Sequence, residues 1–229
     1  MDNIFDTIVS NSMFGVALSI LMYVIGLFLN KKLKTPICNP LLIAIALVIA
    51  VLQVFHIPLE SYLKGGDVIS MFLAPATAVL AYSIYHQIHL LKKYWLPILV
   101  GCLVGAVTSI GSVYLLCKLF GLNETLLASM LPKSVTPPIA MEVSSSLGGT
   151  PSITVAAVVV TGILGAMLSP LFVKLLRLKN KVAIGVAIGS SSHAVGTSKA
   201  VEIGEAEGAM SGIAIGVSGI LTVLISLFL

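Results

Sequence analysis

Residues 182–219 read VAIGVAIGSSSHAVGTSKAVEIGEAEGAMSGIAIGVSG, and this stretch determines what the surrounding apolar sequence can build. It places a serine triplet, a histidine, a lysine and three glutamates between apolar segments. Four glycines at steps of four share one helix face, where a second backbone can pack closely or slide: Gly204, Gly208, Gly212 and Gly216. Polar groups at this density, beside such a face, predict a functional site inside a membrane protein.

The composition is that of a membrane protein. Hydrophobic residues make up 58% of the 229 residues and charged residues only 10%, with a mean hydropathy of +1.10. A soluble domain carries about 25% charged residues, so this chain could not cover a soluble surface. We predict an all-α polytopic membrane protein, a helix bundle forming one integral membrane domain over residues 1–229, with approximate halves 1–120 and 121–229. The net charge of +4 gives no case for a nucleic-acid partner.

Basic clusters indicate which loops face the cytoplasm, because such loops are enriched in lysine and arginine. Clusters occur at residues 31–34, 92–93 and 174–181. If all three are inside, residues 124–151 must cross the membrane an even number of times. Prolines divide this segment into two pieces of about a dozen residues, and each reaches only partway across a core of about 30 Å. We therefore predict a re-entrant pair of half-helices, which is tolerated where it is buried in protein or lines a cavity.

Two short motifs recur along the chain. Residues 74–78 resemble residues 136–140, and the glycines and serine of residues 101–109 recur in residues 162–169. By the charge rule, the two glycine-bearing spans run in opposite directions. This pattern predicts an inverted repeat with a broken helix in each half.

The proline-rich break carries the first group of candidate substrate-binding residues. Lys133 at membrane depth costs about 2.5–3.5 kcal/mol on insertion, and its amine could pair with a substrate carboxylate. Ser134 and Thr136 add hydroxyls, and a half-helix that starts near Pro137 would point free N–H groups at the same place. Pro138, in the first turn of that half-helix, is also a candidate substrate-binding residue. The alternative is that Lys133 extends to the membrane interface.

The serine-rich stretch carries the second group. His193 can titrate near physiological pH, and its neighbours Ser191, Ser192 and Thr197 favour a polar cavity over an ordinary buried histidine. Tyr82 follows the break near residue 75 and could line the path, although an interfacial aromatic is an equal alternative.

Three groups are candidates for ion or proton coupling. His193 is one, and Glu142 is another, because a buried carboxylate in the half-helix could carry a proton. Glu202 is the third, although an ion pair with Lys199 is the simpler interpretation at i,i+3 spacing.

The motifs resemble those of the LrgB/CidB family of bacterial membrane proteins, often described as antiholin-like. The resemblance covers nearly the whole chain and rests on residues 131–136 (LPKSVT), 148–151 (GGTP), 162–166 (GILGA), 191–197 (SSHAVGT) and 207–209 (EGA). It implies two functions. One is transport of small monocarboxylates such as pyruvate, glycolate and glycerate, the last two moved by a related plastid protein. The other is holin/antiholin control of murein hydrolases and lysis with a small LrgA/CidA-type partner.

We predict a secondary transporter of small monocarboxylates in the bacterial plasma membrane, coupled to protons or another ion and working by alternating access. The alternative is the antiholin-like regulator. The partners to test are a small carboxylate, the lipid bilayer, an LrgA/CidA-type protein and a second copy of the chain. No cofactor or metal is expected. An enzyme is not expected, because the adjacent Ser192 and His193 do not set up a catalytic triad. We also expect the elements around Lys133 and His193 to meet near the midplane, because both breaks need partners for freed backbone groups.

Overall fold

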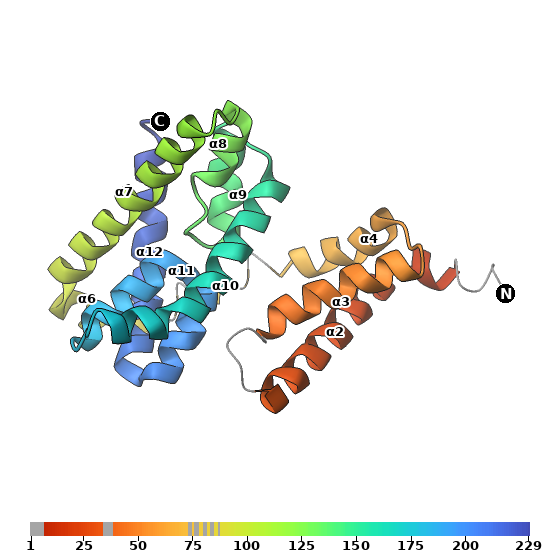
Figure 1. Ribbon diagram of the computed structural model, residues 1–229, viewed down its shortest axis with the longest axis horizontal. Helices are drawn as coiled ribbons and strands as arrows, with labels where there is room; N and C mark the ends of the chain where they lie inside the picture. The colour runs from red at the N-terminus through yellow and green to blue at the C-terminus, as the bar shows by residue number, and fades with distance from the viewer. Residues whose placement is uncertain are drawn as a thin grey trace. The chain divides into compact units, whose positions relative to one another are not determined.

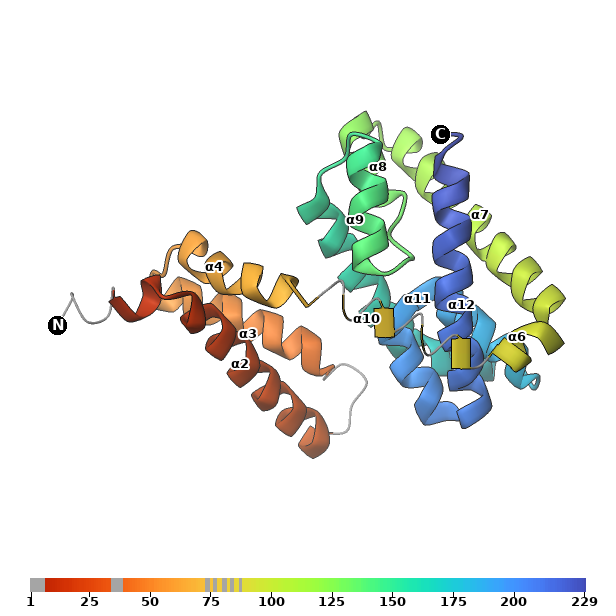
Figure 2. The same cartoon turned by 180° about the vertical axis from the view of Figure 1, so that it is seen from behind.

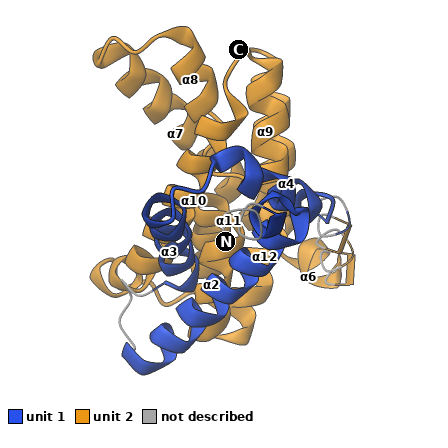
Figure 3. Cartoon of the chain, turned by 90° about the vertical axis from the view of Figure 1, so that its right-hand side faces the viewer, with its two compact units in different colours: residues 1–76 blue, residues 77–229 orange. Residues whose placement is uncertain are grey.

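The structure is a computed structural model that describes residues 7–33, 39–72, 75, 78, 79, 82, 85, 86 and 88–229. All regular secondary structure in those residues is helical. The chain forms two compact units, residues 1–76 and residues 77–229, which Figure 3 colours separately. The division into related halves at residue 120 stays a prediction.

Four helices of the described residues are long and apolar enough to cross a membrane: α2 (Ser12–Leu33), α7 (Trp95–Leu119), α10 (Pro151–Leu175) and α12 (Glu205–Ser226). The shorter α3 (Pro40–Val54) is also apolar. The prediction of an all-α polytopic membrane protein is therefore confirmed. The break expected near residue 75 falls in residues 73–87, of which only 75, 78, 79, 82, 85 and 86 are described.

The unit of residues 1–76 is a small helical bundle. In it, α2 packs against α3 and against α4 (Leu59–Ser70). The start of α3 is fixed by its capping residue, since the Asn39 side chain accepts a hydrogen bond of 2.9 Å from the Leu41 amide and Pro40 occupies the first helical position. The Ser19 and Tyr62 hydroxyls, 2.9 Å apart, join α2 to α4.

Residues 77–229 contain a first helical hairpin formed by α8 (Glu124–Met130) and α9 (Pro137–Ser146), with residues 131–136 as its tip. Figure 1 shows it following α7, which is preceded by the short α6 (Ile88–Lys93). Serine and threonine side chains fasten this hairpin to the start of α10. The Thr150 amide donates to the Ser129 hydroxyl at 2.7 Å, and the Thr154 hydroxyl donates to Ser144 at 2.7 Å. This segment is the predicted pair of half-helices.

A second hairpin is formed within α11 (Lys181–Ile203), because the helix breaks at His193, whose φ of 41° and ψ of −141° are not helical. The two arms fold back on each other. Ile188 and Ala200 belong to one buried cluster, and a Cβ at Gly196 would lie 3.2 Å from the Ile188 side chain. The second arm therefore returns toward the end where the first began, and α12 starts there.

The two hairpins enter the unit from opposite ends. α7 and α10 run in opposite directions, and the base of the first hairpin lies at the far end of α10 from the start of α11 (Figures 1 and 2). Tyr94 and Pro97 at the start of α7 line one cavity with Asn180 and Val182 at the start of α11. The loops at residues 92–93 and 174–181 thus lie at the same end, as the charge rule predicts.

The close contact between α11 and α12 involves Gly185 and Gly189 of the first arm of α11, and Gly208 of α12 against Val201 of the second arm. A Cβ at Gly185 would lie 2.5 Å from the Met210 Cβ, and one at Gly189 would lie 2.9 Å from the Ala214 Cβ. At Gly212 nothing among the described residues lies within 4 Å. α12 turns its Met210 and Ala214 face toward the first arm of α11, and close backbone approach at the Gly212 face stays a prediction.

We expect Gly189→Ala to destabilise the protein, because the added methyl would meet the Ser211 carbonyl oxygen and the Ala214 side chain. Overpacking of this kind costs about 1–3 kcal/mol. Gly212→Ala is the matched control, since it adds the same methyl in open space and improves helix propensity. Thermal unfolding in detergent measures both variants. Equal melting temperatures would show that the close contact is elsewhere.

Candidate functional site

The tip of the first hairpin carries Lys133. Its ammonium group donates to the Ser134 hydroxyl at 3.2 Å, and this hydroxyl lies 2.8 Å from the Ser109 hydroxyl of α7. The ion pairs among the described residues are Lys118–Glu124 and Lys199–Glu202, so Lys133 has no carboxylate partner in that part of the chain. The tip therefore presents a half-buried cation that an anion could neutralise.

The start of α9 offers fewer backbone donors than the sequence analysis expects. Thr136 is the buried N-cap, and Pro137 and Pro138 occupy the first two helical positions. Proline has no N–H, so Ile139 supplies the free amide of the first three helical positions. An anion at this tip would thus depend more on Lys133 and the nearby hydroxyls than on the helix terminus.

The tip of the second hairpin is His193, which is only 2% exposed. Its Nε2 lies 2.9 Å from the backbone oxygen of Val158 in α10. A carbonyl oxygen can only accept, so Nε2 carries the proton and donates. Nδ1 is buried without a partner in the described residues, which leaves it free to accept a proton or a hydrogen bond. The φ of 41° is strained for a non-glycine residue, and such strain is often found at functional sites.

The two hairpins contact neighbouring positions on α7 and on α10. On α7, a Cβ at Gly105 would lie 3.1 Å from the Ser190 hydroxyl, and Ser109, one turn further along, meets Ser134. On α10, Val158 accepts the His193 hydrogen bond with its backbone, while its side chain belongs to one buried cluster with Val135 and Ala140. The elements around Lys133 and His193 therefore contact the same two helices, and their meeting near the midplane stays a prediction.

The glycines of the repeated motif contact the second hairpin from two helices. Gly105 of α7 faces Ser190, and Gly165 of α10 lies directly against Ser192. A Cβ at Gly162 would lie 2.5 Å from the His193 ring. The repeat thus places small residues where polar side chains of the hairpin need room, which explains the similarity of the two spans in packing terms.

The other predicted site residues fall into two groups. Near the second tip, the Ser191 and Ser192 hydroxyls lie 3.0 Å apart, and the Thr197 hydroxyl lies 2.7 Å from that of Ser211 in α12. The remaining residues are exposed in their units: Glu142 on α9, Tyr82, whose ring meets that of His86 edge-on, and Glu202, which pairs with Lys199 at 2.5 Å. Their roles in substrate binding and coupling stay predictions.

Glu207 is a buried carboxylate that the sequence analysis did not select. It is 6% exposed, and its Oε2 is buried without a hydrogen-bond partner among the described residues. It lies in the first turn of α12, against Gly204, whereas its neighbour Glu205 is exposed. An ionisable residue inside a membrane protein is expensive to bury and commonly functional. Three glutamates within a few residues gave no basis for choosing the buried one.

These features define a polytopic helical membrane protein in which two polar hairpin tips both contact α7 and α10. A profile of the LrgB-like family matches residues 19–229. The chain belongs to the LrgB-like family, as the resemblance of its motifs predicts.

The similar proteins cover nearly the whole chain. An antiholin-like protein LrgB from Bacillus mycoides (strain KBAB4) is 40% identical over 213 residues, 93% of each chain. The same identity and coverage hold for an antiholin-like protein LrgB from Bacillus cereus (strain B4264). The uncharacterized protein YxaC from Bacillus subtilis (strain 168) is 40% identical over 206 residues, 90% of each chain. No solved structure shows significant similarity to this chain.

We expect cysteines at positions 109 and 134 to form a disulfide, because the serine hydroxyls that they replace are 2.8 Å apart. The experiment uses Ser109→Cys with Ser134→Cys after Cys38, Cys102 and Cys117 are changed to alanine. Val107→Cys with Ser134→Cys is the control, since Val107 is exposed on α7. Mass spectrometry after mild oxidation counts the cross-link. Equal yields from both pairs would contradict the docking of this tip on α7.

Proposed function

We propose that the chain is a secondary transporter of small monocarboxylates in the bacterial plasma membrane. The observation that carries the proposal is Lys133, which has no carboxylate partner among the described residues and lies at the tip of a membrane hairpin, next to a second tip rich in hydroxyls. Such a half-buried cation favours an anionic ligand, and a small carboxylate needs few contacts beyond one cation and two or three hydrogen-bond donors. Ser134, Thr136, Ser191 and Ser192 are the hydroxyl donors of this proposal.

The arrangement of the hairpins supports alternating access. Each hairpin is open to one end of the unit, so that displacement of one tip would expose the site to one side of the membrane. Broken helices that meet around a central site are the usual device of such transporters. In the proposed cycle, the substrate carboxylate pairs with Lys133, and a tip then moves away from α7 or α10. No catalytic step is part of this cycle.

Proton coupling is the second part of the proposal. The free Nδ1 of His193 could accept a proton when the substrate binds beside it. Glu207 is the second candidate for coupling, because its side chain is buried and its Oε2 has no hydrogen-bond partner among the described residues. The charged groups nearest to it along the chain, Glu205 and the Lys199–Glu202 pair, are on the surface of their unit and leave the buried carboxylate uncompensated.

The names of the relatives favour a second candidate function. Several are called antiholin-like proteins, so this chain could instead regulate lysis with a small LrgA/CidA-type membrane protein. In that case the purified protein would carry no substrate of its own. Uptake of labelled pyruvate, glycolate, glycerate and lactate into proteoliposomes distinguishes the two functions, and the absence of uptake of all four would favour the regulator.

We expect Lys133→Ala to lower uptake about ten- to a hundredfold, the equivalent of about 1.5–3 kcal/mol for a lost charge-assisted contact. Lys31→Ala is the control, because it removes an exposed lysine at the end of α2. Initial uptake rates are compared for proteins with equal thermal stability. A Lys133→Ala protein that folds and transports normally would indicate that Lys133 extends to the membrane interface and does not bind the substrate.

Glu207→Gln and His193→Gln test the coupling. Both variants keep a polar side chain but remove the group that would take up a proton, and the glutamine that replaces His193 retains an amide that can donate to the Val158 oxygen. We expect uptake in these variants to lose its acceleration by an inward proton gradient. Glu205→Gln, in the same helical turn but exposed, should keep it. Proton-driven uptake at the wild-type ratio in both test variants would rule out these two residues as the coupling groups.

A further inference from the structure

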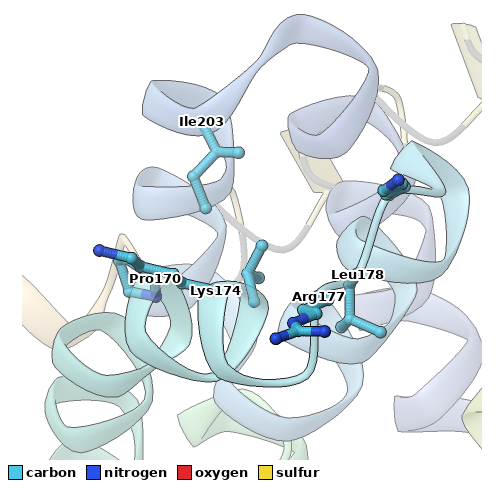
Figure 4. Close-up of a pocket in the computed structure, with 7 residues that line it drawn as sticks. Pro170, Lys174, Arg177, Leu178 and Ile203 are labelled. Atoms are coloured by element: carbon cyan, nitrogen blue, oxygen red, sulfur yellow. The ribbon is translucent and has the colours of Figure 1, made fainter.

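A cavity of about 380 Å³ lies at the end of α10, away from the hairpin tips. Three basic residues line it: Lys174 near the end of α10, and Arg177 and Lys179 in the segment that follows. Its apolar wall includes Leu178 and Ile203, the last residue of α11, as Figure 4 shows. The cavity therefore joins the end of a spanning helix to the returning arm of the second hairpin.

The charge of this cavity is not balanced by the protein. None of the three basic residues takes part in the ion pairs found among the described residues, and the nearby Glu202 already pairs with Lys199. The ends of α10 and α11 contribute about half a negative charge each through their helix dipoles. Three positive charges against about one negative charge leave an excess of about two, which suits a phosphate group.

The backbone fixes Arg177 at the rim. The Leu178 amide donates to the Val173 oxygen at 3.0 Å, and the Arg177 amide donates to the Lys174 oxygen at 3.2 Å, which together form a Schellman motif. Arg177 occupies the left-handed position of this motif, with φ of 51°. The same turn after α7 has Gly121 there, with φ of 64°. A non-glycine residue in this position costs about 1–2 kcal/mol, so the turn tolerates Arg177 without favouring it.

We propose that this cavity binds the phosphate of an anionic phospholipid, with Lys174, Arg177 and Lys179 around the phosphate and the acyl chains along α10. A lipid fits better than a soluble phosphate, because α10 presents exposed apolar residues beside the cavity: Leu171 is 57% exposed and Leu175 is 68% exposed in its unit. The charge rule assigns this end to the cytoplasmic leaflet. The bound lipid joins α10 to the returning arm of α11 through Ile203. This inference does not depend on the proposed transport.

The test measures lipid binding to the full chain in a neutral detergent by native mass spectrometry. Phosphatidylglycerol, phosphatidylcholine and inorganic phosphate are the three probes. We expect phosphatidylglycerol to bind more tightly than phosphatidylcholine, and inorganic phosphate at millimolar concentration not to displace it. Equal binding of the two lipids would overturn the proposal, and so would displacement of the lipid by inorganic phosphate, which would indicate a soluble ligand.

Arg177→Gly is the informative variant, because glycine suits the left-handed turn and should leave the fold intact or more stable. We expect about a fivefold loss of phosphatidylglycerol affinity, and about a hundredfold loss when Lys174→Ala and Lys179→Ala are added. The control triple variant, with Lys31, Lys32 and Lys92 changed to alanine, removes three exposed cations elsewhere. Equal losses in the two triple variants would show diffuse attraction and overturn the site.

Discussion

The fold of residues 77–229 depends on hydrogen-bond partners for the polar groups at two helix breaks that are shielded from water. Every unpaired N–H or C=O in a bilayer core costs several kcal/mol, so a break survives only where neighbouring elements supply partners. Here α7 and α10 supply them. Ser109 meets the tip of the first hairpin, and the Val158 oxygen holds the ring of His193. The helices α7 and α10 thus supply hydrogen-bond partners to the two hairpin tips, although the sequences of these helices are almost entirely apolar.

Small residues of α7 and α10 allow the second hairpin to pack closely against these helices. Gly105, Gly162 and Gly165 leave space for Ser190, His193 and Ser192, side chains that carry the polarity of the second hairpin. A methyl group at any of these glycines would push the hairpin outward. The repeated motif of the two spans is therefore a packing requirement as well as a sign of internal symmetry.

Much of this arrangement could be predicted from the sequence, because prolines at helix breaks and clusters of basic residues are visible in the local sequence. The prolines of residues 132–138 marked the first hairpin, and the basic clusters placed the starts of α7 and α11 at one end. The choice of helix face could not be predicted in the same way. α12 is apolar or small on most of its surface, so nothing local separates the Gly212 face from the face that contains Met210 and Ala214. The burial of Glu207 likewise follows from the position of α11 and not from its own neighbours.

The returning arm of α11 has a consequence for the topology of the whole C-terminal region. Because the second arm ends where the first began, the 23 residues of α11 contribute no net crossing of the membrane. We then expect α12 to cross once, starting from the end that carries Lys174 and Arg177. This topology predicts Leu229 on the opposite face of the bilayer from that basic segment. A hydropathy count that treats α11 as an ordinary span predicts the other compartment, so a reporter domain fused after Leu229 distinguishes the two topologies.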